Sequence, residues 1–161
     1  MDARTIYDIF VGAGMTREGA LATVGNFKKE ATEELIPTQV QFGCSKRTNE
    51  QYTAAVDNGF LDFADSIGYG LAQWTLGSRK RKLLSYAKAC GSSIGDGIMQ
   101  CHFTVKEMQE DFPAIWKLLT TSHDIDACCD KVCEVYENPE VKNYTEISRS
   151  EERRVGKECR S

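Results

Sequence analysis

The sequence predicts a single, mainly α-helical domain with one irregular, partly β segment between its second and third helices. Apolar residues recur every three or four positions over most of the chain, and capping residues precede several of these stretches. Residues 35–68 lack this period and are rich in loop-forming residues. The chain has 161 residues, of which 41% are hydrophobic and 27% are charged, and these values fit one domain with its own core.

Two helices are predicted in the first 30 residues. The first ends at Gly12-Ala13-Gly14, and Thr16 is suited to cap the second, because its hydroxyl group accepts a hydrogen bond from the first helical turn. Glu30 is expected in or just after the last turn of this second helix. The apolar positions of the two helices are Ile6, Ile9 and Phe10, then Ala20, Leu21, Val24 and Phe27.

The segment from residue 35 to residue 68 is predicted to form loops with a small hairpin. Pro37, Gly43 and the polar run 45–51 interrupt any helical period. Asp57-Asn58-Gly59 is typical of a tight hairpin turn. This segment therefore forms a small β and loop lobe in the predicted fold.

Four further helices are predicted, each placed by a capping residue or by proline. Glycine at position 91 suits the end of the first of them, because glycine readily adopts a positive φ. The helices run from Ser78 to Ala89, from Asp96 to about Asp111, from Pro113 to Leu119, and from Asp124 to a point before Pro139.

The last 14 residues differ in composition from the rest of the chain. Residues 148–161 are dense in Arg, Glu and Lys, and Val155 is their one apolar residue besides Cys159. We therefore expect a catalytic domain over residues 1–147 and a solvated or foreign tail over residues 148–161.

Charge and hydropathy exclude several classes of protein. The net charge of −4 disfavours a general binder of nucleic acid. The first ten residues lack the basic start and apolar core of a secretory signal, and no apolar run is long enough to span a bilayer. We expect synthesis in the cytoplasm, no membrane insertion, and either a monomer or one module of a longer protein.

The seven cysteines are expected to be mostly free thiols, because their number is odd and no Cys-x-x-Cys pair occurs. Cys128, Cys129 and Cys133 lie near His123, which suggests a zinc site, but their helical spacing favours core packing. We expect no metal and no cofactor. The basic run Arg79-Lys80-Arg81-Lys82 is predicted to be a solvated helix face and not a nucleic-acid site.

The segment Gly68-Tyr69-Gly70-Leu71-Ala72-Gln73-Trp74 has the composition of a binding loop. Its glycines allow a close approach of the backbone, Gln73 supplies hydrogen-bond donors and an acceptor, and Trp74 supplies a flat apolar face. These groups suit a sugar, which has polar edges and apolar faces. Glu30 lies upstream, and a carboxylic acid beside a sugar is the minimum needed to break a glycosidic bond.

The order of these motifs resembles the phage tail lysozyme family, which comprises cell-wall-degrading domains of phage endolysins and tail proteins. The resemblance covers residues 6–141. It is carried by Gly14-Met15-Thr16, Gly25-Asn26 with Glu30, Tyr52 to Gly59, Gly68 to Thr75 with Ser78-Arg79-Lys80, Ser93 to Asp96, and Tyr136-Glu137-Asn138-Pro139, where the family more often has Glu-Arg-Pro. A Glu followed by Gly-Leu-x-Gln is also similar to goose-type lysozymes and lytic transglycosylases.

The resemblance implies a lysozyme-like fold, with an acid at a helix end facing a β lobe, and bacterial peptidoglycan as the substrate. Glu30 is then the general acid, with a pKa raised by burial and by the helix C-terminus. Asp65 is the candidate second carboxylate, with Asp57 and Asp62 as alternatives. The residues expected to bind the substrate are Tyr69, Gln73, Trp74 and Asn26.

Each of these assignments has a structural alternative. Glu30 is otherwise a solvated surface residue, Asp65 is otherwise a turn former, and Trp74 is otherwise part of the core. The sequence leaves these readings open.

The expected function is that of a muramidase, which hydrolyses the bond between N-acetylmuramic acid and N-acetylglucosamine. One alternative is a lytic transglycosylase, in which the muramyl 6-hydroxyl group attacks and leaves a 1,6-anhydro product. Another is a catalytically impaired wall-binding or virion module, because the family usually has Ser where this chain has Ala31. The protein would act on the wall after release by a holin or as part of a virion.

Overall fold

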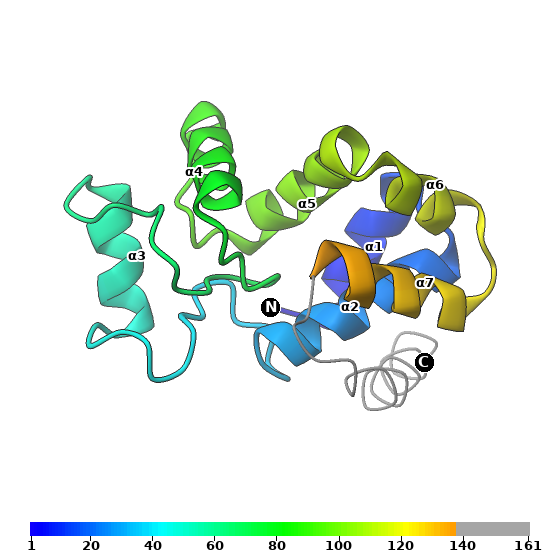
Figure 1. Ribbon diagram of the computed structural model, residues 1–161, viewed down its shortest axis with the longest axis horizontal. Helices are drawn as coiled ribbons and strands as arrows, with labels where there is room; N and C mark the ends of the chain where they lie inside the picture. Colours follow the sequence, from blue (N-terminus) through cyan, green and yellow to red (C-terminus); the bar gives the residue numbers. More distant parts are fainter. Residues whose placement is uncertain (138–161) are drawn as a thin grey trace.

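The computed structural model describes residues 1–137 and consists almost entirely of helices, as predicted (Figure 1). The predicted tail, residues 148–161, lies outside the described residues. The helices are α1 (Ala3–Gly12), α2 (Arg17–Glu30), α3 (Asn49–Asp57), α4 (Gly77–Cys90), α5 (Gly97–Asp111), α6 (Pro113–Thr121) and α7 (Ile125–Lys131), followed by a π-helical turn, η1 (Val132–Tyr136).

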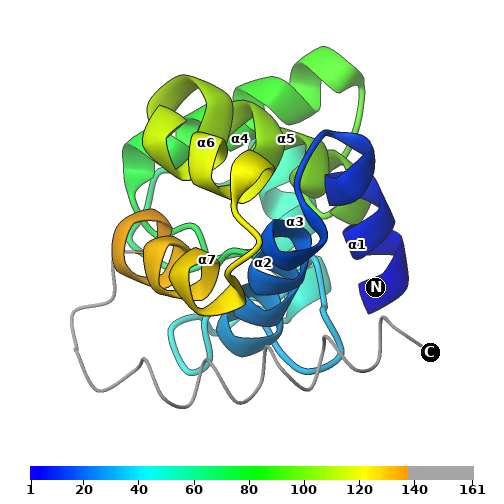
Figure 2. The ribbon, with the colours of Figure 1, turned by 90° about the vertical axis from the view of Figure 1, so that its right-hand side faces the viewer.

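Helix α2 lies among the other helices of the main body (Figure 2). It contacts α1, α6, α7 and η1, and every residue from Gly19 to Lys28 is buried. The approach of α6 is close, since a Cβ atom added to Gly19 would lie 2.2 Å from the backbone oxygen of Leu119. Packing on several sides fixes the direction of α2 and the position of its C-terminal residue, Glu30.

Residues 31–76 form a lobe beyond the C-terminal end of α2 (Figure 1). The lobe contains α3 and two isolated antiparallel bridges, Val40 with Tyr69 and Tyr69 with Trp74. Backbone hydrogen bonds join Gln41 to Gly68 at 2.8 Å and Gly70 to Gln39 at 2.9 Å. The predicted small lobe is confirmed. The predicted second and third helices, which flank it, correspond to α2 and α4 of the structure.

The hairpin predicted at Asp57-Asn58-Gly59 is wrong, because these residues end a helix. The hydroxyl group of Thr48 accepts a hydrogen bond from the backbone of Gln51 (3.1 Å), and the Gln51 side chain accepts one from the backbone of Thr48 (3.0 Å). This reciprocal capping box starts α3 inside the polar run that was predicted to be loop. Asp57 then accepts a hydrogen bond from the backbone of Ile94 at 3.0 Å, which ties the end of α3 to the segment before α5.

Most of the predicted helix boundaries are confirmed. Thr16, Asp96 and Asp124 cap α2, α5 and α7 through their side chains, and Gly91 ends α4 with a φ of 66°. The predicted cap at Ser78 is wrong, because α4 begins at Gly77 and its N-cap residue is Leu76, whose side chain makes no capping hydrogen bond.

Two further properties of residues 1–137 bear on the protein class. None of the helices in this part of the chain combines the length and the hydropathy needed to cross a bilayer. Four cysteines within it, at positions 101, 128, 129 and 133, are buried, and the two at positions 44 and 90 are exposed. The buried cysteines lie in the part of the chain that forms the helical core.

Candidate active site

Glu30 is the last residue of α2, as the sequence predicts. Its side chain is partly buried, and among residues 1–137 it forms neither a hydrogen bond nor an ion pair. Burial raises the pKa of Glu30, while the positive charge of Lys29 lowers it. A carboxyl group with a raised pKa that still reaches the surface is suited to deliver a proton.

Two buried oxygen atoms near Glu30 in the chain lack hydrogen-bond partners within the described residues. They are Oδ1 of Asn26, one turn earlier on α2, and Oγ1 of Thr32, two residues later. A buried acceptor without a partner is costly, so such atoms favour the arrival of a donor. Asn26 is 0% exposed, and its predicted contact with substrate stays a prediction.

Glu137 brings a second carboxyl group to the end of α2. Its Oε1 accepts a hydrogen bond from Nδ2 of Asn26 at 2.7 Å. Burial and then the negative charge of Glu30 raise the pKa of Glu137 well above its usual value, against the opposing effects of Arg79 and the Asn26 amide. Glu137 was not among the predicted site residues. Its signal is a carboxylate directly after Tyr136, at the end of an apolar helical stretch.

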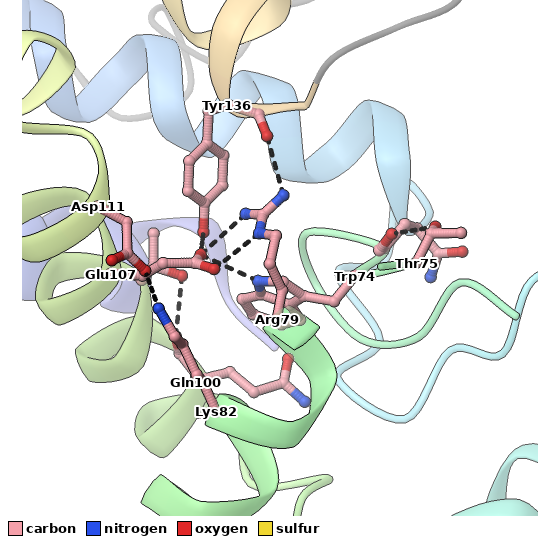
Figure 3. A network of polar contacts seen from close by, with 10 residues as sticks. Trp74, Thr75, Arg79, Lys82, Gln100, Glu107, Asp111 and Tyr136 are labelled. Carbon is pink, nitrogen blue, oxygen red and sulfur yellow. Dashed lines mark hydrogen bonds and ion pairs between the residues drawn. The ribbon is translucent and has the colours of Figure 1, made fainter. Parts of the chain in front are cut away.

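Glu107, on α5, lies at the centre of a buried network that joins α5 to three other segments of the chain (Figure 3). It accepts hydrogen bonds from Nε and Nη2 of Arg79 at 2.7 and 2.8 Å, from the Tyr136 hydroxyl group at 2.6 Å, and from Nε1 of Trp74 at 3.2 Å. Arg79 also donates to the backbone oxygen of Tyr136 at 3.0 Å and lies 4.5 Å from the centre of its ring. The network connects α4, α5 and the Trp74 turn to η1, next to Glu137.

The basic run 79–82 is only partly the solvated face that was predicted. The side chains of Arg79 and Lys80 are 16% and 0% exposed and are paired with Glu107 and Asp65. Lys82 does lie at the surface, where it pairs with Asp111. The prediction is wrong for Arg79 and Lys80 because their partners lie 28 and 15 residues away in the sequence.

Asp65 holds the lobe to α4. It forms an ion pair with Lys80, and it accepts hydrogen bonds from the Tyr52 hydroxyl group at 2.7 Å and the Ile67 backbone at 3.0 Å. Lys80 in turn donates to the backbone oxygen of Ile67 at 2.6 Å. These contacts give Asp65 a structural role that needs no substrate, and its predicted role in the reaction stays a prediction.

The motif at residues 68–74 forms a tight turn whose aromatic side chains face inward. Tyr69 and Trp74 are both 0% exposed. Tyr69 stacks on Tyr52 with ring centres 5.5 Å apart. Gln73 has a φ of 46° and remains partly exposed, and its Nε2 donates to the backbone oxygens of Gln39 and Gly70 at 3.0 Å each. Of the residues predicted to bind substrate, Gln73 is therefore the one with exposed surface.

The positive φ of Gly70 favours glycine in this turn, and two glutamine side chains approach the backbone there. A Cβ atom at Gly70, where φ is 79°, would lie 2.9 Å from Oε1 of Gln100. That oxygen accepts a hydrogen bond from the backbone of Leu71 at 2.9 Å. A Cβ atom at Gly68 would similarly lie 2.9 Å from Oε1 of Gln73. The groups that approach these glycines are side chains of the protein itself.

A hollow of about 440 Å³ lies between α4 and α5, away from the predicted chemistry. Tyr86, Phe103 and Glu107 contribute to its walls, and Glu30 does not. Within the described residues, no cluster of three or more His, Cys, Asp or Glu side chains is arranged to hold a metal ion.

One comparison with known proteins identifies a relationship. A family model described as phage tail lysozyme matches residues 1–155 of the chain. The match includes residues 148–155, the first part of the predicted tail. No curated protein and no solved structure matches the chain.

Replacement of Glu107 by Gln should destabilise the protein strongly. The side chain of Glu107 is 0% exposed, so its loss of charge leaves Arg79 without its buried counter-ion. Breaking a buried ion pair from one side typically costs about 3–5 kcal/mol. Chemical denaturation of the variant and the wild type measures the difference.

Glu110→Gln is the matched control on the same helix. Glu110 pairs with Lys106 at the exposed surface, and such pairs contribute about 0.5 kcal/mol or less. Equal stabilities of the two variants would contradict the role given to Glu107.

Replacement of Asp65 by Asn should lower the melting temperature, because Lys80 is 0% exposed and loses its counter-ion. The expected cost is about 2 kcal/mol, less than for a fully buried pair because the Asp65 side chain is 26% exposed. Asp62→Asn, at an exposed position in the same loop, is the control. Normal stability together with a severe loss of activity in Asp65→Asn would instead support a direct role in the reaction.

Proposed function

The chain belongs to the phage tail lysozyme family, and we propose that it hydrolyses the bond between N-acetylmuramic acid and N-acetylglucosamine in bacterial peptidoglycan. Membership makes it a lysozyme-like protein of the cell-wall-lytic type. The observation that carries the finer proposal is Glu30, a partly buried carboxyl group with a raised pKa at the end of a rigid helix.

In the proposed reaction, Glu30 supplies a proton to the oxygen that bridges the two sugars. The bond from the anomeric carbon to that oxygen breaks, and its electron pair goes to the oxygen. Water adds to the anomeric carbon and loses one proton, and Glu30 regains a proton before the next turnover. Each cycle therefore consumes one water molecule and leaves the enzyme unchanged.

The environment of Glu30 sets the pH range of this reaction. Burial favours the neutral carboxyl group, so the protonated form persists to higher pH than for an exposed glutamate. The rate should fall as the pH rises through this raised pKa, because the ionised carboxylate has no proton to give. Lys29 works in the opposite direction and limits the shift.

A lytic transglycosylase is the second candidate, and the contacts of Asp65 favour it. That route uses the muramyl 6-hydroxyl group in place of water, so it needs only one carboxyl group. Asp65 is occupied by Lys80, Tyr52 and the Ile67 backbone, which supports a reaction carried by a single acid.

Gln73 is proposed to contact the sugar from the lobe. Its side chain is partly exposed, and its amide nitrogen is held by two backbone oxygens, so the amide group is already ordered before a substrate binds. For Tyr69 and Trp74 we propose a supporting role, since both side chains are 0% exposed and give shape to the turn from within the core. We propose that the protein reaches the wall after release from the cell or as part of a virion.

Replacement of Glu30 by Gln should abolish lysis and leave folding intact. The amide has nearly the same shape as the carboxyl group but has no acidic proton, and loss of a general acid costs about a hundredfold or more in rate. The decrease in turbidity of a cell-wall suspension measures the rate, and a thermal melt verifies the fold.

The matched control is Glu34→Gln, an exposed glutamate four residues further along the chain. It should lyse at the wild-type rate. Near-normal lysis by Glu30→Gln would remove Glu30 from the proposed mechanism.

A further inference from the structure

A short turn in the lobe carries a phenylalanine that is almost completely exposed. The backbone of Cys44 donates a hydrogen bond to the backbone oxygen of Gln41 at 3.2 Å, and Gly43 has a φ of 75°. Residues 41–44 therefore form a β-turn of the kind that needs a positive φ at its third position. Phe42 occupies the second position and is 97% exposed. Since almost none of its surface is covered, the ring contributes little to the core and is available to a ligand.

This turn is fastened to the motif at residues 68–74. The backbone nitrogen of Gln41 donates to the backbone oxygen of Gly68 at 2.8 Å, and the backbone nitrogen of Gly68 donates to Oε1 of Gln41 at 2.9 Å. A Cβ atom at Gly68 would lie 3.4 Å from Oε1 of Gln41 and 2.9 Å from Oε1 of Gln73. The side chains of the two glutamines therefore lie beside the same glycine, and Phe42 directly follows one of them.

Each of these two amide groups has one polar atom in use and one to spare. Nε2 of Gln73 gives its two hydrogens to the backbone oxygens of Gln39 and Gly70, and Oε1 of Gln41 accepts from the backbone of Gly68. These backbone partners fix which way round each amide lies. Within residues 1–137, Oε1 of Gln73 and Nε2 of Gln41 make no hydrogen bond. An unused acceptor and an unused donor thus lie on either side of Gly68.

We propose that Gln41, Phe42 and Gln73 form a subsite for an N-acetylated sugar. An acetamido group has one N–H donor and one carbonyl acceptor, which match Oε1 of Gln73 and Nε2 of Gln41. The ring of Phe42 covers the apolar face of the same sugar. This proposal rests on the proposed function and on the contact proposed there for Gln73. It adds the group that the subsite recognises and two residues that recognise it.

The same arrangement gives the subsite its specificity. A sugar with a hydroxyl group in place of the acetamido group offers one polar atom where the two glutamines can engage two. It therefore leaves one of the amide groups unpaired and binds more weakly. Both amide groups are held by the backbone before a ligand arrives, so little side-chain freedom is lost when the acetamido group binds.

Three variants separate these contributions. Gln41→Glu keeps an oxygen for the Gly68 backbone but replaces Nε2 by a second oxygen, which repels the acetyl carbonyl group. Phe42→Ala removes the ring at a position where it supports no packing. Phe60→Ala is the matched control, because Phe60 is a second phenylalanine of the lobe and is 85% exposed.

Calorimetric titration with two oligosaccharides tests the proposal. The probes are a tetramer of N-acetylglucosamine and a tetramer of glucose, and the full chain carries Glu30→Gln in every case so that neither probe is cleaved. We expect this parent protein to prefer the acetylated tetramer by about tenfold or more. Gln41→Glu should abolish the preference, Phe42→Ala should weaken the binding of both tetramers by about fivefold to tenfold, and Phe60→Ala should change neither affinity.

Equal affinities of the parent for the two tetramers would overturn the proposal, and so would the failure to bind either. Binding by Phe42→Ala that is as tight as that of the parent would also overturn it. If Gln41→Glu does not fold, the preference of the parent and the loss in Phe42→Ala decide, because the Phe42 side chain is exposed and its removal leaves the fold intact.

The outcome is distinguishable from that of the proposed function. Lysis by the Glu30→Gln variant contradicts the function and leaves a measured preference for the acetylated tetramer in place. An inactive Glu30→Gln variant combined with equal affinities for the two tetramers contradicts only the subsite.

Discussion

The buried ion pair between Arg79 and Glu107 is the interaction on which the arrangement of the site depends. Glu107 is surrounded by donors from α4, from the Trp74 turn and from Tyr136, and its side chain is 0% exposed (Figure 3). Each charge is costly to bury without the other, so the two groups must come together for these segments to pack. By holding Tyr136 the pair also places Glu137, while the packing of α2 places Glu30. The end of η1 thus reaches α2 from a distant part of the chain, where Glu137 accepts a hydrogen bond from Asn26, one turn before Glu30.

Rigid support at this point suits the role proposed for Glu30. A general acid must meet the bridging oxygen within hydrogen-bond distance, and small displacements are costly in rate. Helix α2 is buried from Gly19 to Lys28, so Glu30 starts from a fixed backbone. The lobe is fixed separately, through the ion pair of Asp65 with Lys80 on α4. Arg79 and Lys80 are neighbours on α4. Their two ion pairs therefore fix the site and the lobe relative to the same helix.

Local signals in the sequence were sufficient to predict most helices. The sequence does not show which residues from distant parts of the chain contact each other. Thr16, Asp96 and Asp124 mark helix starts because a cap acts within three residues of itself. Helix α3 was missed because its capping box lies inside a polar run that also fits a loop. Glu107 was missed although it lies four residues after the buried Phe103, a position where a charge on an apolar helix face indicates a partner. The position of Glu30 at a helix end was predicted from the sequence, but the hydrogen bond of Glu137 to Asn26 depends on a fold that brings together residues 111 positions apart.

Analysis of the sugars released from purified cell wall tests the central claim most directly. After digestion, the new glycan ends are reduced with borohydride and identified by mass spectrometry. The account predicts reduced N-acetylmuramic acid at the new ends, and none with the Glu30→Gln variant. Glycan strands that remain intact would contradict the account, and 1,6-anhydro ends would contradict hydrolysis and assign the reaction to a transglycosylase.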